Sequence, residues 1–358
     1  MTNSSHPPIA SAARNPAALS MGEGNTPLIR SRSIGPALGL RELWFKYEGA
    51  NPTGSYKDRF AVAAVSRLVE QGKRLCLGTS SGNTGAAVAA YCARAGISCH
   101  LAIVEGAPEG KLRQMRAYGA DLLRIRGFGT SPAVTQEVMQ GLAKLAADLN
   151  GGVEVSAYAL SPHGMAGVES LGHELAAALQ DRNFEVFSPA GGGGLTLAVA
   201  RGLRTAGARA AVHCVQPEGN DTIAGPLRRG ETKAIAQDSL TQISGLQVGA
   251  VLDGNEVIAA CRASGGQGHV VRDVAVWAMQ ARLAREEGVF CEPAGAVALT
   301  GLVEAVRNED VDTHAPVVCL VTGSGFKDER SVLRMTGVDE TPTVGGWMDF
   351  VAKVTNSE

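Results

Sequence analysis

Residues 58–106 decide the fold class, and they read DRFAVAAVSRLVEQGKRLCLGTSSGNTGAAVAAYCARAGISCHLAIVEG. Residues 58–72 have the apolar spacing of a helix and end on a glycine, a common helix stop. The apolar runs at 74–80 and 98–106 are typical of buried strands, and an Ala-rich helix is expected between them over 83–96. This alternation predicts a parallel sheet with helices packed on its faces.

The same alternation continues along the chain. Further strands are expected over 43–48, 121–127, 184–190, 210–219 and 315–325, and further helices over 109–119, 196–207, 273–288 and 296–308. With 358 residues and a long middle segment, the chain has room for two such units. The expected fold class is therefore α/β, with mostly parallel sheets flanked by helices.

Composition narrows the possible partners and locations. Hydrophobic residues make up 45% of the chain, charged residues 19%, and the net charge is −2. Because no basic cluster could follow a phosphate backbone, no nucleic-acid partner is expected. The first 20 residues lack the apolar core of a secretion signal, and no apolar run is long enough for a membrane span. Seven scattered cysteines lack C-x-x-C spacing, so we expect reduced thiols, no metal and a cytoplasmic protein.

Three expected strands end in loops of unusual chemistry: LGTSSGNTG at 77–85, SPAGGGGLT at 188–196 and CLVTGSGFKD at 319–328. In open parallel sheets, ligands bind where the carboxyl ends of the strands lead into loops. A fourth segment, EGANPTGSYKDRF at 48–60, places Lys57 after a turn of small residues, with an Asp-Arg pair directly behind it. A solvated lysine is the simple interpretation, but such a setting also suits a lysine that must reach a bound ligand.

Each loop has a structural and a functional interpretation. The glycines Gly191, Gly192, Gly193 and Gly194 could close around one phosphate at a helix N-terminus, although a tight strand–helix turn would explain two of them. They match neither a dinucleotide fingerprint nor a Walker loop. Ser80, Ser81, Asn83 and Thr84 could bind a carboxylate, or could form an ordinary helix cap. Thr322 is a neutral partner for a ring nitrogen, or part of a turn.

The four segments together favour pyridoxal phosphate chemistry. An enzyme that uses this cofactor needs a lysine to bind its aldehyde, a loop to bind its single phosphate and a partner for its ring nitrogen. It also needs a site for the substrate carboxylate. No Ser-His-Asp or Cys-His arrangement competes in the sequence. A metabolite-binding protein and a nicotinamide oxidoreductase are weaker alternatives, because Lys57 and the loops are intact and the dinucleotide fingerprint is missing.

The motifs resemble those of the fold-type II pyridoxal phosphate enzymes, and among them the threonine synthases. The resemblance extends from Met21 to Asp328. It rests on MGEGNTPL, KYEGANPTGSYKDR, GNTGAAVAAYCARAG, LAREEGVFCEPA and TGSGFKD. It implies two open, twisted, mostly parallel sheets with pyridoxal 5'-phosphate between two domains. The expected divisions are a flexible leader (1–20), a large cofactor domain (21–57 and 160–345), a small mobile domain (58–159) and a tail (346–358).

The resemblance also implies roles for individual residues. Lys57 would hold the cofactor covalently and move protons, and Asn83 would bind its phenolic oxygen. Gly191 to Gly194 would hold the phosphate, and Thr322 would face the ring nitrogen. Ser80, Ser81, Asn83 and Thr84 would bind the carboxylate of a small amino-acid substrate. The resemblance implies a homodimer. The reaction that it implies is elimination or replacement at the β or γ carbon of an amino acid, and the best single named activity is the conversion of O-phosphohomoserine to threonine.

The chain departs from the threonine synthase pattern NP-x-R-x-x-G-x-K-T. The corresponding run is SPHGMAGVES, with Gly164 in place of the arginine and Glu169 in place of the lysine. Each lost charged contact to the substrate phosphate is worth about 1.5–3 kcal/mol. EPAGA at 292–296 and Tyr56 before the lysine also differ from the usual EPASA and Phe. Serine/threonine dehydratase-like elimination or cysteine synthase-like replacement on an unphosphorylated amino acid is therefore the alternative.

Overall fold

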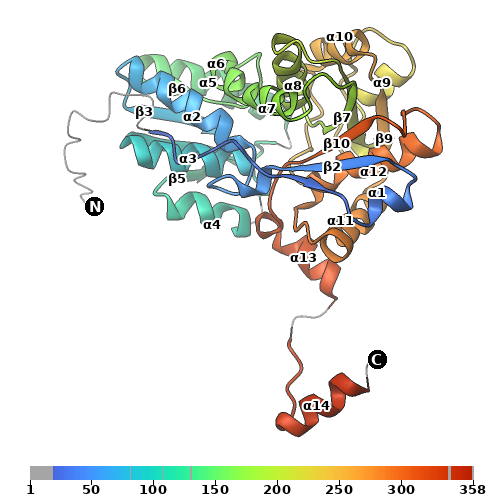
Figure 1. Cartoon of the computed structure of the whole chain (residues 1–358). Helices are drawn as coiled ribbons and strands as arrows, with labels where there is room; N and C mark the ends of the chain where they lie inside the picture. Colours follow the sequence, from blue (N-terminus) through green and yellow to red (C-terminus); the bar gives the residue numbers. More distant parts are fainter. Residues whose placement is uncertain (1–18, 81, 108, 130, 338–339, 357–358) are drawn as a thin grey trace.

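The structure is a computed structural model that describes residues 19–356, except 81, 108, 130 and 338–339. It contains two separate sheets (Figure 1). The six-stranded sheet has the order β1 (Leu28–Arg30), β2 (Glu42–Tyr47), β10 (Pro316–Val321), β7 (Phe184–Pro189), β8 (Ala210–Pro217) and β9 (Gly268–Val271). Its strands run parallel except β1, which pairs antiparallel with β2.

The four-stranded sheet is built from the middle of the first half of the chain. Its order is β5 (Asp121–Arg124), β4 (Ser98–Ile103), β3 (Leu75–Thr79) and β6 (Gly152–Val153). All neighbouring strands are parallel. The two mostly parallel sheets confirm the expected fold class.

Helices connect the strands and cover the sheets (Figure 1). They are α1 (Ile34–Ala37), α2 (Lys57–Glu70), α3 (Asn83–Ala95), α4 (Glu109–Ala117), α5 (Pro132–Asp148), α6 (Pro162–Val168), α7 (Ser170–Ala178), α8 (Gly194–Thr205), α9 (Ala224–Arg228), α10 (Gly254–Ser264), α11 (Asp273–Glu287), α12 (Pro293–Arg307), α13 (Glu329–Thr336) and α14 (Trp347–Thr355). Short 3-10 helices are η3 (Glu48–Ala50), η4 (Glu218–Asn220) and η5 (Gly325–Lys327). In the part of the chain that is described, no helix has the length and apolar character to cross a membrane.

The large sheet is buried on both faces because its strands alternate side chains between two cores. Val186 packs in the core shared with α8, and its neighbour Phe187 packs in the core formed with α11 and α12. The first core continues through α2 and α3 to the small sheet. The first core therefore joins the two sheets, and α2 contributes to it in contact with α3 and α6.

The strands and helices expected from the sequence all form, with boundaries shifted by a few residues. Helix α3, for example, ends at a glycine, Gly96, which has the left-handed φ of 64° that such an ending requires. Leu19, which falls within the expected leader, is buried in the core. Residues 1–18 lie outside the described residues. The division into a large domain and a small mobile domain stays a prediction.

Candidate active site

Lys57 is the first residue of α2. Its Nζ donates a hydrogen bond to Ser156 Oγ, and Ser156 Oγ lies 3.2 Å from Thr84 Oγ1. The ring of Tyr56 packs beside the amine, with its centroid 4.5 Å from Nζ. These contacts give the lysine a fixed position next to the N-terminus of α3.

Burial determines the protonation of this lysine. Because the amine is removed from water, the pKa of Lys57 falls to about 7, although the carboxylates of Glu292 and Asp253 partly oppose the change. An amine with this pKa is largely neutral at slightly alkaline pH and can act as a nucleophile or as a base. A solvated lysine would stay protonated, so the simple interpretation of Lys57 does not hold.

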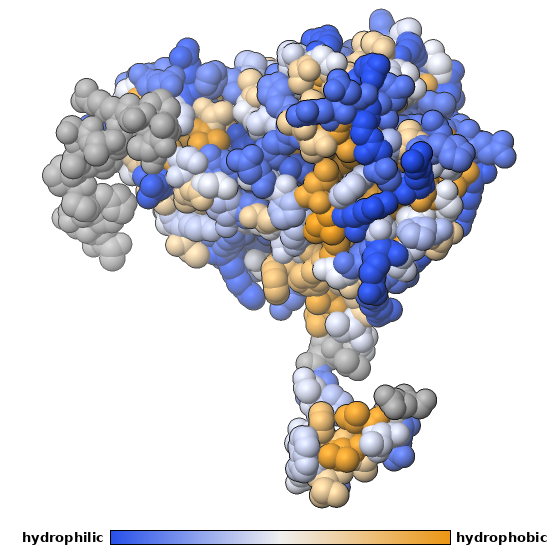
Figure 2. Space-filling view, viewed as in Figure 1, coloured by the Kyte–Doolittle hydropathy of each residue, from blue (hydrophilic) through white to orange (hydrophobic). Residues whose placement is uncertain are grey.

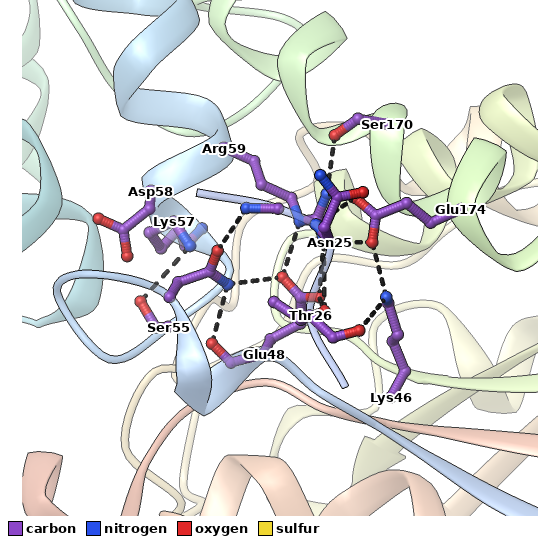
Figure 3. A network of polar contacts seen from close by, with 12 residues as sticks. Asn25, Thr26, Lys46, Glu48, Ser55, Lys57, Asp58, Arg59, Ser170 and Glu174 are labelled. Atoms are coloured by element: carbon purple, nitrogen blue, oxygen red, sulfur yellow. Dashed lines mark hydrogen bonds and ion pairs between the residues drawn. The ribbon is translucent and has the colours of Figure 1, made fainter. Parts of the chain in front are cut away.

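The Asp-Arg pair behind Lys57 anchors the start of α2, as Figure 3 shows for the arginine. Arg59 is only 2% exposed and makes bonds of 2.8 and 2.9 Å to the two carboxylate oxygens of Glu48. Its other side reaches Glu174, which also accepts a 2.6 Å bond from Lys46. Although burial alone would raise it, these donors hold the pKa of Glu174 at about 2. The network joins α2, β2 and α7.

Asp58 supports the loop on the other side of Lys57. Its Oδ2 accepts bonds from the N–H and the hydroxyl of Thr53, at 3.1 and 2.9 Å. Burial raises the pKa of Asp58 to about 6, while the Thr53 bonds and the charge of Lys327 oppose that rise. Lys327 in turn donates to Thr53 O at 2.9 Å. The turn before Lys57 is thus tied to the segment that follows β10.

The loop between β3 and α3 presents an anion site. Asn83 and Thr84 are the first residues of α3, and among the described residues their N–H groups have no hydrogen-bond partner. Ser80 Oγ accepts from the N–H groups of Gly82 and Gly85, at 3.3 and 2.9 Å, so this side chain orders the loop. Ser81 lies outside the described residues. Free N–H groups at a helix N-terminus suit a carboxylate.

The four glycines form a second anion site between β7 and α8. Gly193 has a φ of 98°, and within the described residues the N–H groups of Gly191 to Gly193 are unpartnered. A Cβ on Gly193 would lie 2.7 Å from Val257 Cγ2, so only glycine fits there. A Cβ on Gly194 would lie 3.1 Å from Asp253 Oδ2 and 3.5 Å from Ser156 O. The glycine turn therefore borders the segment that contacts Lys57.

The end of β10 completes the site. The hydroxyl of Thr322 is buried and has no partner among the described residues, which leaves an uncompensated polar atom. The backbone here is bridged to Ser55, just before Lys57, and Tyr56 N donates to Thr322 O at 3.1 Å. Next to it, Glu292 Oε1 accepts a 2.6 Å bond from Asn83 Nδ2. Burial raises the pKa of Glu292.

These features fit pyridoxal phosphate. The unpartnered N–H groups of the glycine turn could hold its single phosphate, Thr322 could bind its ring nitrogen, and Lys57 could take its aldehyde. The orphaned Thr322 hydroxyl supports this most directly, since a buried hydroxyl without a partner costs free energy unless a ligand satisfies it.

A family model described as "Pyridoxal-phosphate dependent enzyme" matches residues 19–323. The chain belongs to this family. It is 32% identical over 329 residues to a threonine synthase of Halalkalibacterium halodurans, covering 91% of this chain and 88% of the relative. A threonine synthase of Methanocaldococcus jannaschii is 31% identical, with coverages of 88% and 78%. The chain is accordingly a threonine synthase-like lyase that depends on pyridoxal phosphate.

Solved structures show the same fold at lower identity. Maize serine racemase superposes with a TM-score of 0.74, at 22% identity and coverages of 90% and 94%. Threonine deaminase isoform 2 of Solanum lycopersicum has a TM-score of 0.71, at 21% identity and 87% coverage of both chains. These similarities confirm that this family member has the fold-type II architecture.

Sequence reasoning brought together Lys57, Asn83, Thr84, the glycines and Thr322, and the structure places them at one site. It missed Ser156, Glu292 and Asp253. Glu292 carried a usable signal, because it precedes a proline at the start of α12 in a quoted motif. Asp253 Oδ2 and Oδ1 accept from the N–H groups of Tyr158 and Ala159, at 2.9 and 3.1 Å, and nothing in the sequence indicates that pairing.

The two departures from the threonine synthase pattern have structural explanations. Gly164 is buried where α6 crosses α2, and a Cβ there would lie 2.6 Å from the Phe60 ring. Glu169 Oε1 accepts a 2.7 Å bond from the Tyr158 hydroxyl, and the Arg201 guanidinium carbon lies 4.0 Å from the Tyr158 ring centroid. With Phe60 and Ala64 packed against it in this chain, position 164 has no room for an arginine.

We expect Gly164→Ala to destabilise the chain by about 1–3 kcal/mol, because the methyl group would overpack the α2–α6 contact. Urea unfolding monitored by circular dichroism measures the change. Gly141→Ala is the matched control, since Gly141 is in helix α5 with open space around it and should gain about 0.5–1 kcal/mol. A Gly164 variant as stable as the Gly141 variant would contradict the close packing.

Proposed function

We propose that the chain converts O-phosphohomoserine to threonine, releasing inorganic phosphate from the γ carbon and adding water at the β carbon. The observation that carries the proposal is the Lys57 amine, whose pKa burial lowers to about 7 and which donates a hydrogen bond to Ser156 beside the N-terminus of α3. The names of the curated relatives support this reaction over others of the family.

Pyridoxal phosphate, when bound, withdraws electrons from the α carbon of the amino acid attached to it. Lys57 would remove and return protons at the substrate carbons, since its pKa of about 7 suits a general base. Ser156 and Thr84 form a short hydroxyl chain from Nζ, so they would keep the amine aimed at the reacting carbon.

The N-terminus of α3 would orient the substrate. Its free N–H groups at Asn83 and Thr84 can bind the α-carboxylate, with the helix dipole adding to the attraction. The amide of Asn83 is fixed by Glu292 and could bind the phenolic oxygen of the cofactor through its remaining hydrogen. Ser80 would act through the loop that it orders, and its direct contact with the substrate stays a prediction.

A specific observation favours a second candidate. The carboxylate of Asp253 lies beside Gly194, and the charges acting on the Lys57 amine are those of Asp253 and Glu292. O-phosphohomoserine would bring its own phosphate, in addition to that of the cofactor, close to these carboxylates, which would repel it. Serine and threonine carry no such group. Dehydratase-like elimination, giving a keto acid and ammonia, or replacement at the β carbon of an activated serine, is therefore the second candidate.

Product analysis decides between the two. The cofactor-loaded protein is incubated separately with O-phosphohomoserine, serine and threonine, and phosphate, threonine, keto acid and ammonia are measured. The proposal predicts phosphate and threonine in equal amounts from O-phosphohomoserine. Keto acid and ammonia from serine or threonine, without turnover of the phosphorylated substrate, would contradict it and support the second candidate.

The pKa of Lys57 predicts how cofactor loading depends on pH. Only the neutral amine attacks an aldehyde, so loading should fall about tenfold per pH unit well below 7 and level off above it. Stopped-flow absorbance of the cofactor-free protein mixed with pyridoxal phosphate between pH 5.5 and 9 measures this rate. A rate that still rises tenfold per pH unit between pH 8 and 9 would show an ordinary, solvated lysine instead.

The proposal includes a cytoplasmic homodimer in which a small domain, 58–159, closes over the substrate. All seven cysteines are free and buried, which supports a reducing compartment. A bond between Lys111 of α4 and Ser244, together with its 3.3 Å ion pair to Asp328, joins the small-sheet side to the large-sheet side. Such contacts are the kind that closure would make and break.

A further inference from the structure

Helix α14 is an amphipathic arm that stands away from the body of the molecule (Figure 1). None of its residues is buried, and Trp347, Phe350 and Val354 share one face, 50–71% exposed. The Trp347 and Phe350 rings stack at 5.5 Å, and Figure 2 shows this apolar group open to solvent. A nine-residue helix is marginal alone in water, so it gains stability only when its apolar face is covered.

A cavity of about 850 Å³ on the body has aromatic and aliphatic side chains in its lining that could contact the apolar face of α14. Its apolar lining includes Trp277, Phe290, Phe326 and Leu333, and the Phe326 side chain is 88% exposed. Phe290 and Phe326 pack edge to face at 5.0 Å and leave an aromatic rim. Such an exposed aromatic rim is typical of a surface that binds another apolar element.

Charged side chains of both signs line the cavity, with Asp328 and Glu329 beside its arginines. Arg113, Arg330 and Arg334 line the cavity, and Arg113 is 74% exposed. Helix α14 carries an acidic group in its first turn, at Asp349. With the apolar face of α14 in the cavity, the Asp349 carboxylate would face a rim that includes three arginines.

The geometry points to a second copy of this chain as the occupant: we infer that α14 of one subunit docks in the cavity of its partner and that the partner returns the contact. Helix α13 lines the cavity and ends at Thr336, and α14 stands away from the body that carries this cavity (Figure 1). Residues 337–346 can span at most about 36 Å, enough to reach across a two-fold axis to a neighbouring subunit. Because each subunit places its α14 in the cavity of the other, the association of two subunits forms this contact twice.

Cross-linking distinguishes a partner's cavity from the chain's own. A tagged Leu333→Cys chain and an untagged Phe350→Cys chain are mixed and oxidised, and non-reducing electrophoresis resolves the mixed dimer. All native cysteines are buried, so they should contribute little. We expect a mixed band at least tenfold stronger than with Ala352→Cys, which is exposed on the opposite face of α14. Equal bands for Phe350→Cys and Ala352→Cys would overturn the inference.

The double variant Leu333→Cys/Phe350→Cys on one chain covers the remaining case. A cross-link only within single chains would show that the arm folds back on its own subunit. In the full-length protein, Trp347→Ser with Phe350→Ser should raise the dimer dissociation constant at least tenfold by sedimentation velocity, while Ala352→Ser leaves it unchanged. An unchanged constant in the double variant would also contradict the exchange. These tests are independent of the proposed reaction.

Discussion

Replacing Lys57 by alanine should lower turnover by at least about 10³-fold, the largest effect of any substitution at the site. The change removes both the attachment point of the cofactor and the base that moves substrate protons. At neutral pH the buried amine lowers stability, because its lowered pKa means that the folded state binds this proton more weakly than the unfolded state does. We therefore expect the Lys57→Ala chain to unfold at the same temperature as the parent or higher.

Two further measurements separate this loss from misfolding. Lys144→Ala is the matched control, because Lys144 is exposed on helix α5, and it should keep full activity. Added methylamine should restore part of the Lys57→Ala activity by replacing the missing base. Turnover by Lys57→Ala within tenfold of the parent would mean that another residue carries the chemistry.

Replacing Arg59 by alanine should cost about 3–5 kcal/mol of stability, the largest structural effect. Glu48 is fully buried, and Glu174 shares the same guanidinium, so the substitution leaves carboxylates without their main partner. Since the network holds the start of α2, activity should fall together with stability. The free energy of unfolding from urea titration measures the first effect.

Arg67→Ala gives the matched comparison on the same helix. Arg67 is 49% exposed and lies 3.5 Å from Glu70, so its loss should change stability by less than about 0.5 kcal/mol. If the two arginine substitutions cost the same, the buried network does not stabilise the start of α2. Arg59→Lys should recover only part of the loss, because an ammonium group cannot make both two-oxygen contacts.

Much of the fold could be predicted because its elements have strong local signals. Alternating apolar runs and glycine stops located α2, α3, β3 and β4 within a few residues. The four-residue strand β9 and the three-residue strand β1 were not predicted. Both are short, and they exist through pairing with β8 and β2, which depends on contacts distant in sequence.

The candidate site was predictable where residues follow strand ends, and not where contacts are distant in sequence. Thr322 and the glycines lie directly after β10 and β7, so topology brings them together. Ser156 lies in an irregular segment with no motif, yet it is the residue bonded to the Lys57 amine. Gly164 looked like a lost arginine, and only the α2–α6 crossing explains it as a packing residue.

The most direct test of the account is to locate the cofactor on the chain. The protein loaded with pyridoxal phosphate is reduced with borohydride, digested, and analysed by tandem mass spectrometry. The account predicts one molecule of cofactor per chain, attached to Lys57 and displaced before reduction by a reactive amino acid. Attachment to another lysine, such as Lys327 or Lys111, or no attachment at all, would contradict it.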